Sequence, residues 1–72
     1  MRLLYLSGAD LSGLDLSGIK LAGLNMEGAD LSSALLVRAQ ATGASFKGAR
    51  LAAANLSEVQ LQDADLEGAA GA

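Results

Sequence analysis

The chain has 72 residues, with five Lys and Arg against eight Asp and Glu, so its formal net charge is −3. It contains no Cys, His or Pro, which excludes disulfides, zinc sites built from Cys or His, and nucleophiles activated by a His base. A net negative charge is unfavourable for binding nucleic acid. Apolar runs such as Ala34 to Val37 are far too short to cross a membrane.

The first residues do not form a targeting signal. The apolar stretch Leu3 to Leu6 is followed at once by Ser7 and Gly8, whereas a secretory signal needs a longer apolar region. We therefore expect the protein in the cytoplasm, as a single small domain over residues 1–72.

A five-residue repeat begins at Leu4 and continues to the end of the chain. We call the residue in the place of Leu11 the centre of its unit, and the residue two positions earlier the leading residue. Every leading residue is Ala, Leu, Ile or Val, and every centre is apolar except Gly71. The other positions are mostly polar or Gly, so the centre and the leading residue should face an interior.

An α-helix cannot use this spacing. Five residues at about 100° each advance by about 140° net, so the apolar residues would spiral around every side of a helix. A flat strand fails as well, because the gaps between apolar residues alternate between two and three. The shorter gap fits an extended side and the longer gap fits a corner. Gly follows two residues after the centre, where a turn residue with positive φ belongs, at positions 8, 13, 18, 23, 28, 43, 48 and 68.

The charged residues indicate how many sides close one coil. Charges that stack directly above one another should have opposite signs. A spacing of 20 residues satisfies this rule best, although it also places Asp10 over Asp30. Four units of five residues therefore form one coil. The attractive pairs at this spacing are Glu27–Lys47, Lys47–Glu67, Asp30–Arg50 and Arg38–Glu58.

The motif Ala-(Asp/Asn)-Leu starts at Ala9, Ala29, Ala54 and Ala64. With this motif, essentially the whole chain resembles the pentapeptide-repeat proteins. The resemblance implies an all-β fold, a right-handed quadrilateral β-helix, which at 20 residues per coil gives about 3.6 coils for 72 residues. The Gly- and Ala-rich residues 69–72 are expected to fray.

The register assigns interior side chains to columns that run through the stack. Leu21, Ala41 and Leu61 share one column, and Phe46 belongs to the next. We interpret the small Ala41 beside the large Phe46 as volume compensation within one coil, because packed interiors tolerate neither voids nor overfilling.

The carboxylates do not predict catalysis. Asp10, Asp15 and Asp30 stand among Ser and Gly on an open face, and a regular rod offers no cleft that would shift a pKa for acid–base chemistry. We predict that the protein is not an enzyme and that it has no cofactor, no metal site and no small-molecule substrate.

Two surfaces are candidates for contact with another chain. Leu35 and Val37 flank a centre on one side of the rod and are expected to point outward. Leu4, Tyr5 and Leu6 lie in the first coil, whose end would expose backbone groups and core side chains. We predict a non-catalytic structural or protein–protein interaction module. Self-assembly through coil ends is the alternative, with the N-terminal coil as the favoured contact.

A third function rests on the resemblance alone. Some members of the family inhibit or protect DNA gyrase as acidic mimics of DNA. Duplex DNA carries one charge per ~1.7 Å, so a rod about 17 Å tall would need about ten negative charges. The net charge of this chain is only −3, which makes DNA mimicry the least supported alternative.

Overall fold

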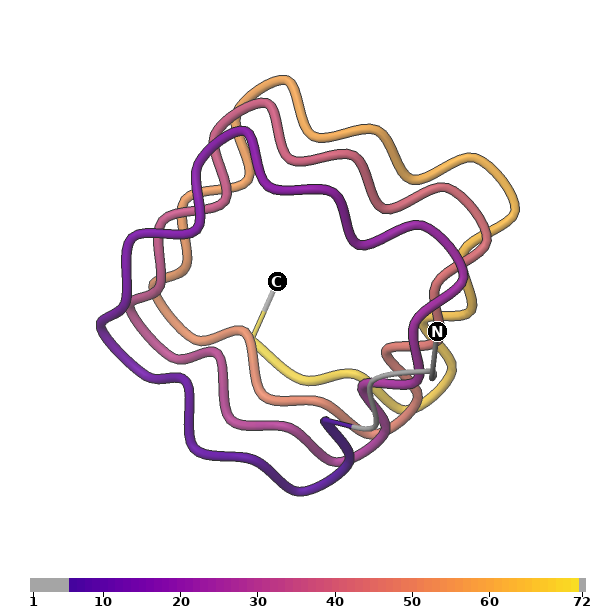
Figure 1. The fold of residues 1–72 in the computed structure, drawn as a ribbon. Helices are drawn as coiled ribbons and strands as arrows, with labels where there is room; N and C mark the ends of the chain where they lie inside the picture. Colours follow the sequence, from indigo (N-terminus) through magenta and orange to yellow (C-terminus); the bar gives the residue numbers. More distant parts are fainter. Residues whose placement is uncertain (1–5, 72) are drawn as a thin grey trace.

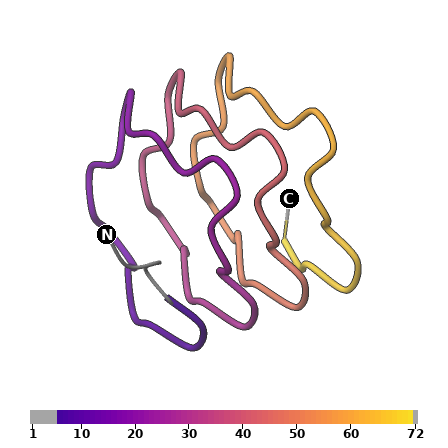
Figure 2. The same cartoon turned by 45° about the vertical axis from the view of Figure 1, so that its right-hand side comes forward.

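The computed structural model describes residues 6–71, which wind into a four-sided coil around one axis (Figure 1). Within this range there is no helix, and strand pairing is limited to isolated parallel bridges rather than longer strands. Each bridge joins residues 20 apart, from Asp10 with Asp30 to Arg50 with Ala70. The predicted four units per coil are therefore confirmed, and successive coils lie side by side along the axis (Figure 2).

Backbone hydrogen bonds in both directions join each unit to its neighbours in the stack. In the unit of residues 31–35, the Leu31 amide donates to the Arg50 carbonyl of the next coil at 2.7 Å. The Leu35 amide donates to the Leu14 carbonyl of the previous coil at 2.9 Å. Because every unit inside the stack repeats this arrangement, the backbone alone fixes the distance between coils and the register of their side chains.

The remaining amides of the same unit are used at its corner. The Ala34 amide closes a turn on the Leu31 carbonyl at 3.0 Å, and the third turn residue, Ser33, has a φ of 61°. Positive φ at that place defines a type II turn. The Ser32 amide donates to Oδ1 of Asp30 at 3.0 Å, and the Ser33 amide donates to the next coil. All five backbone donors of the unit are thus satisfied.

The side-chain cap explains why Asp or Asn so often precedes the centre. In six units with Asp or Asn at this position, the side-chain Oδ1 accepts a hydrogen bond from the amide of the residue two positions later, with N–O distances of 3.0 to 3.1 Å. Such Asx turns stabilise a corner locally and need no partner from another coil. The capping residues are Asp10, Asp15, Asn25, Asp30, Asn55 and Asp65.

The corners adopt positive φ whether or not the sequence supplies Gly there. A Cβ built on Gly13 or Gly43 would meet nothing within 4 Å, so these glycines serve the backbone conformation rather than a close approach. Five other corners reach φ values of 57° to 61° with side chains that are strained in this region. These residues are Ser33, Arg38, Ala53, Glu58 and Asp63.

The core lies inside the middle of the stack. Leading residues and centres between residues 21 and 51 are nearly all buried, and Met26, Leu31 and Leu36 are the largest side chains that are sealed from solvent. The sequence assignment of these positions to the interior is therefore confirmed. Near the C-terminal end, the Ala70 amide donates to the Ala49 carbonyl at 3.0 Å. Fraying of the segment stays a prediction, and Ala72 lies outside the described residues.

We predict that Leu31→Asp prevents folding. The side chain is fully buried in the middle coil, where an unpaired carboxylate costs several kcal/mol, on the order of 3 or more. Circular dichroism should show loss of the folded signal at room temperature. Asp15→Asn is the control, because an amide oxygen can still cap the corner, and a similar loss in that variant would contradict the inward and outward assignment.

We predict that Ala53→Gly stabilises the protein by about 0.5–1 kcal/mol, because Gly adopts the φ of 61° without the strain that a Cβ causes. The greater conformational freedom of Gly in the unfolded chain offsets part of this gain. Thermal melting measures the change. Ala52→Gly is the matched control, because its φ is not positive and the substitution only adds flexibility. An equal or larger gain in the control would show that strain at Ala53 is not the cause.

Candidate functional site

The two end coils leave inward-facing side chains in contact with solvent. Met26 and Leu31 in the middle are fully buried, whereas the leading residues Leu14 and Ile19 are 46% and 39% exposed and the centre Leu66 is 40% exposed. Their register directs these side chains inward, and they are exposed because no further coil among residues 6–71 covers them. Exposure of Leu66 at the C-terminal end was predicted from the sequence, whereas Leu14 and Ile19 were not singled out, although the 20-residue register already placed both in the first coil.

Backbone groups at the ends are open in the same way. The Leu36 amide donates to the Asn55 carbonyl at 2.8 Å, whereas the equivalent Leu56 amide, one coil later, has no acceptor among the described residues. At the other end, the Gln40 amide donates to the Ile19 carbonyl of the preceding coil at 2.9 Å. The equivalent Lys20 amide, one coil earlier, has no such acceptor within residues 6–71. The two ends therefore present complementary backbone groups in extended geometry.

The predicted side surface is centred on one residue. Leu35 is 40% exposed and is bridged on either side by Asp15 and Asn55, as the register predicted. Val37 is only partly exposed, so it contributes less apolar area than expected. A single leucine between polar neighbours is ordinary for a protein surface.

The predicted residues of the first coil are described only in part. Leu6 is half-buried, and its amide donates to the Asn25 carbonyl at 3.0 Å. Leu4 and Tyr5 lie outside the described residues. The contribution of these three side chains to an interaction surface stays a prediction.

The predicted charge ladder forms in part. Nε of Arg38 lies 2.9 Å from Oε1 of Glu58, and Nζ of Lys47 lies 4.0 Å from Oε1 of Glu67. Glu27 and Lys47 lie in one column as predicted, and the Gly28 amide donates to the Lys47 carbonyl at 2.9 Å. No ion pair joins their side chains among the described residues, and Oε2 of Glu27 accepts a hydrogen bond from the Ser45 hydroxyl at 3.4 Å. Both ion pairs are exposed, so each is worth at most about 1 kcal/mol.

The aspartates considered for acid–base chemistry are held as ionised caps. The Ser12 hydroxyl at 2.7 Å and the Ser12 amide lower the pKa of Asp10, against weaker opposing effects that include the charge of Asp30. The Ser17 amide, at 3.0 Å, lowers the pKa of Asp15 in the same way. Hydrogen bonding that favours the charged form suits a structural cap and opposes proton uptake at neutral pH.

Two further kinds of site have no support in the described part of the chain. No three acidic side chains of residues 6–71 gather in a group that could hold a metal ion. The same residues contain no helix long and apolar enough to span a membrane.

Comparison with known proteins identifies the repeat. The model of the family described as pentapeptide repeats matches residues 4–36 and 34–69, with eight copies. No curated protein matches the sequence.

Solved structures show the same architecture. A pentapeptide repeat protein from the cyanobacterium Cyanothece 51142 is 38% identical with a TM-score of 0.76, over 78% of this chain and 38% of that protein. Another, from Nostoc PCC 7120, is 30% identical with a TM-score of 0.63, over 94% of this chain and 60% of that protein. The chain thus spans less than two thirds of either protein. The predicted right-handed quadrilateral β-helix is confirmed.

We predict that stability falls as the pH drops below about 4. Hydrogen bonds hold the folded-state pKa values of Asp10, Asp15 and Asp30 below the usual 3.8. The stability that these ionised caps contribute is therefore fully present above pH 3.8 and is lost as the pH falls through the lowered pKa values. Changing all three to Asn keeps the acceptor atom and removes the titration. Melting temperatures followed from neutral pH down to about pH 2 should then vary less than in the parent.

The control for this experiment is Asn55→Ala, which removes a corner cap that carries no titrating group. It should leave the acid dependence of the melting temperature nearly unchanged. If the triple variant follows the same pH profile as the parent, the caps do not cause the acid sensitivity.

Proposed function

The chain belongs to the pentapeptide-repeat family, and we propose that it acts as a non-catalytic structural and protein-interaction module whose binding surfaces are its coil ends. Fold alone does not determine function, so the proposal rests on the surface that this particular chain presents. The observation that carries it is the exposure of inward-register leucines at both ends, Leu14 at 46% and Leu66 at 40%.

A further coil of the same kind is the best occupant of such an end. Within the stack, the Leu36 amide donates to the Asn55 carbonyl and the Asn55 amide donates to the Ala34 carbonyl. The last coil offers the same kind of donor at the Leu56 amide, and the first coil offers extended residues such as Asp15 that could receive it. The same hydrogen bonds that join coils within the chain can therefore join two chains.

A second copy of the chain supplies such a coil, which favours self-association as the mode of interaction. The pairing between stacked coils is parallel, so the C-terminal end of one copy matches the N-terminal end of the next. A contact of this kind is heterologous and can continue from copy to copy. Covering an end would also bury the apolar side chains that the end coils now expose.

We predict that the apparent mass rises above the 7.2 kDa of one chain as the protein concentration increases. Light scattering of the parent should be compared with Leu14→Lys, Leu66→Lys and Leu35→Lys, which place the same charge at the first coil, the last coil and the side. The two end variants should remain monomeric because a buried ammonium opposes stacking, whereas Leu35→Lys should associate like the parent.

Mixing the two end variants gives a sharper test. Leu14→Lys keeps an intact C-terminal end and Leu66→Lys keeps an intact N-terminal end, so the mixture should form a dimer although neither variant does so alone. Circular dichroism confirms that each variant is folded. A parent that stays monomeric at every concentration overturns self-association. Loss of association in Leu35→Lys alone would instead assign the contact to the side surface.

A further inference from the structure

Leading residues differ in size between the middle of the stack and its ends. Those covered by described coils on both faces are all alanines without exposed surface, namely Ala29, Ala34, Ala39, Ala44 and Ala49. The first coil instead carries Leu14 and Ile19, which are 46% and 39% exposed, and the last coil carries Val59, which is partly buried. The space between two stacked coils is therefore matched to a small leading residue.

No two bulky leading residues among residues 6–71 lie directly over one another. Leu14 is followed by Ala34 in the next coil, and Ile19 is followed by Ala39, which separates it from Val59. A packed interior tolerates neither overfilling nor voids, so large and small side chains alternate between facing layers. A second copy that continues the stack should meet the same requirement at its contact.

One head-to-tail register of two copies meets this requirement. It sets Leu14 in the first coil of one copy over Ala64 in the last coil of the copy before it. The facing pairs are Leu14 with Ala64, Ile19 with Ala69, and Ala9 with Val59. We propose, building on the self-association proposed above, that copies of this chain recognise one another in this register alone. Leu14 and Ala64 lie on opposite sides of the four-sided coil, so successive copies are related by half a turn about its axis.

The neighbouring registers do not fit. A shift back by one unit sets Leu14 over Val59 and places Leu6 of one copy where Gly71 of the other copy already lies. A shift forward by one unit leaves no described residue over Val59. Larger shifts either overlap more of the last coil or cover less of it. The size of the leading residues and the room along the spiral therefore select the same register.

The selected register also pairs the open backbone groups of both ends. By the pattern of hydrogen bonds inside the stack, the Leu61 amide of one copy faces the Asp10 carbonyl of the next. The Asp15 amide of that next copy faces the Ala64 carbonyl in the same way. Neither amide has an acceptor among residues 6–71 of its own chain. The contact therefore extends the parallel bridges of the stack from one chain into the next.

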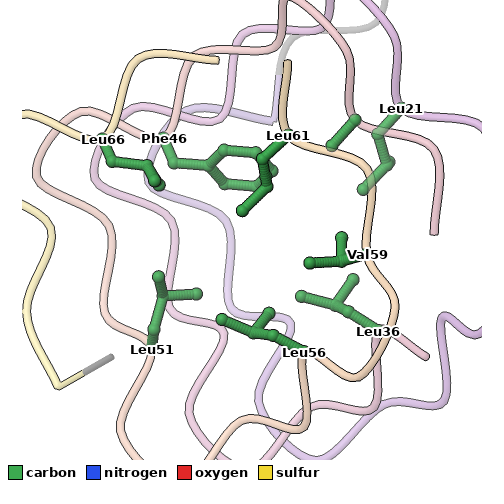
Figure 3. A pocket seen from close by; sticks show the side chains of 9 residues that line it. Leu21, Leu36, Phe46, Leu51, Leu56, Val59, Leu61 and Leu66 are labelled. Carbon is green, nitrogen blue, oxygen red and sulfur yellow. The ribbon is translucent and has the colours of Figure 1, made fainter. Parts of the chain in front are cut away.

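The apolar hollow at the C-terminal end is closed by the same contact (Figure 3). Leu61 and Leu66 line the hollow, and Leu66 is 40% exposed. In the selected register, Leu11 of the next copy lies over Leu61, and Leu16 lies over Leu66. Both covering leucines are only partly buried in the first coil, so apolar surface of two ends is removed from water together.

One pair of like charges provides a signature of the register. Asp15 of one copy lies over Asp65 of the other, whereas Asp10 lies over the uncharged Gln60. The chain tolerates one such pair internally, where Asp10 is bridged to Asp30. Facing carboxylates nonetheless weaken the contact, so a positive charge at either position should strengthen it.

An exchange of side-chain sizes tests the packing. Ala64→Leu sets a leucine against Leu14, so light scattering should show a dissociation constant about tenfold or more above that of the parent. Leu14→Ala added to Ala64→Leu in one chain again pairs a large residue with a small one, and association should return to the parent level. Ala22→Leu adds the same side chain at an exposed position that directly follows a centre, and it should associate like the parent.

An exchange of charge tests the register by a second route. Asp15→Lys and Asp10→Lys make the same charge change, and each removes one corner cap, but only position 15 faces Asp65. The dissociation constant of Asp15→Lys should be about fivefold lower than that of Asp10→Lys. Addition of Asp65→Lys to Asp15→Lys should abolish this difference, because two ammonium groups then face each other.

The outcomes separate the register from the self-association on which it rests. Circular dichroism identifies the variants that fold, and if Ala64→Leu does not fold, the charge variants decide alone. The register is wrong, although self-association stands, if the parent associates and folded Ala64→Leu associates equally well. The same conclusion follows if the double size variant does not recover, or if Asp15→Lys binds no more tightly than Asp10→Lys. A parent that stays monomeric throughout overturns both.

Discussion

The hydrogen bond between stacked coils is the constraint on which the rest of this structure depends. Each centre inside the stack donates its amide to a carbonyl 19 residues later, as Leu31 does to Arg50, and the geometry is repeated at the next centre. The distance between walls is consequently set by the backbone rather than by the side chains inside. Apolar columns fill an interior of fixed width, and at the C-terminal end the partly buried Leu56, Val59 and Leu61 line an apolar hollow that no further coil among the described residues closes (Figure 3).

The same constraint explains how the chain tolerates strained corners. Ser33, Ala53 and Asp63 hold φ values of 61° although none of them is Gly. An isolated turn would avoid this conformation, at a cost of about 1–2 kcal/mol per residue. Here each corner is closed by its own turn hydrogen bond and lies beside a corner of the same shape in an adjacent coil. The surrounding structure therefore holds the corner residue at positive φ despite the strain. Gly is consequently favoured at the corner without being required there.

Periodicity in the sequence was sufficient to predict the fold, whereas features that depend on individual contacts were not predictable from it. The inward positions, the corners and the 20-residue register all derive from spacing, and Arg38 pairs with Glu58 as that register implies. Glu27 lies in the correct column, yet its side chain turns to Ser45, because exposed ion pairs are too weak to fix a rotamer. The caps made by Asp10 and its equivalents depend on local geometry, which an apolar pattern does not encode.

Stability in such a stack comes from nearest neighbours, and this links the fold to its proposed function. A coil in the middle is hydrogen-bonded and covered on both faces, whereas an end coil has only one neighbour. The first and last coils therefore form the least stable part of the rod, as the exposure of Leu14 and Leu66 illustrates. Any chain that continues the stack supplies hydrogen bonds and apolar contacts that the end coil lacks, and its binding would stabilise that coil at the same time. In this architecture, recognition of a partner and completion of the fold are the same physical event.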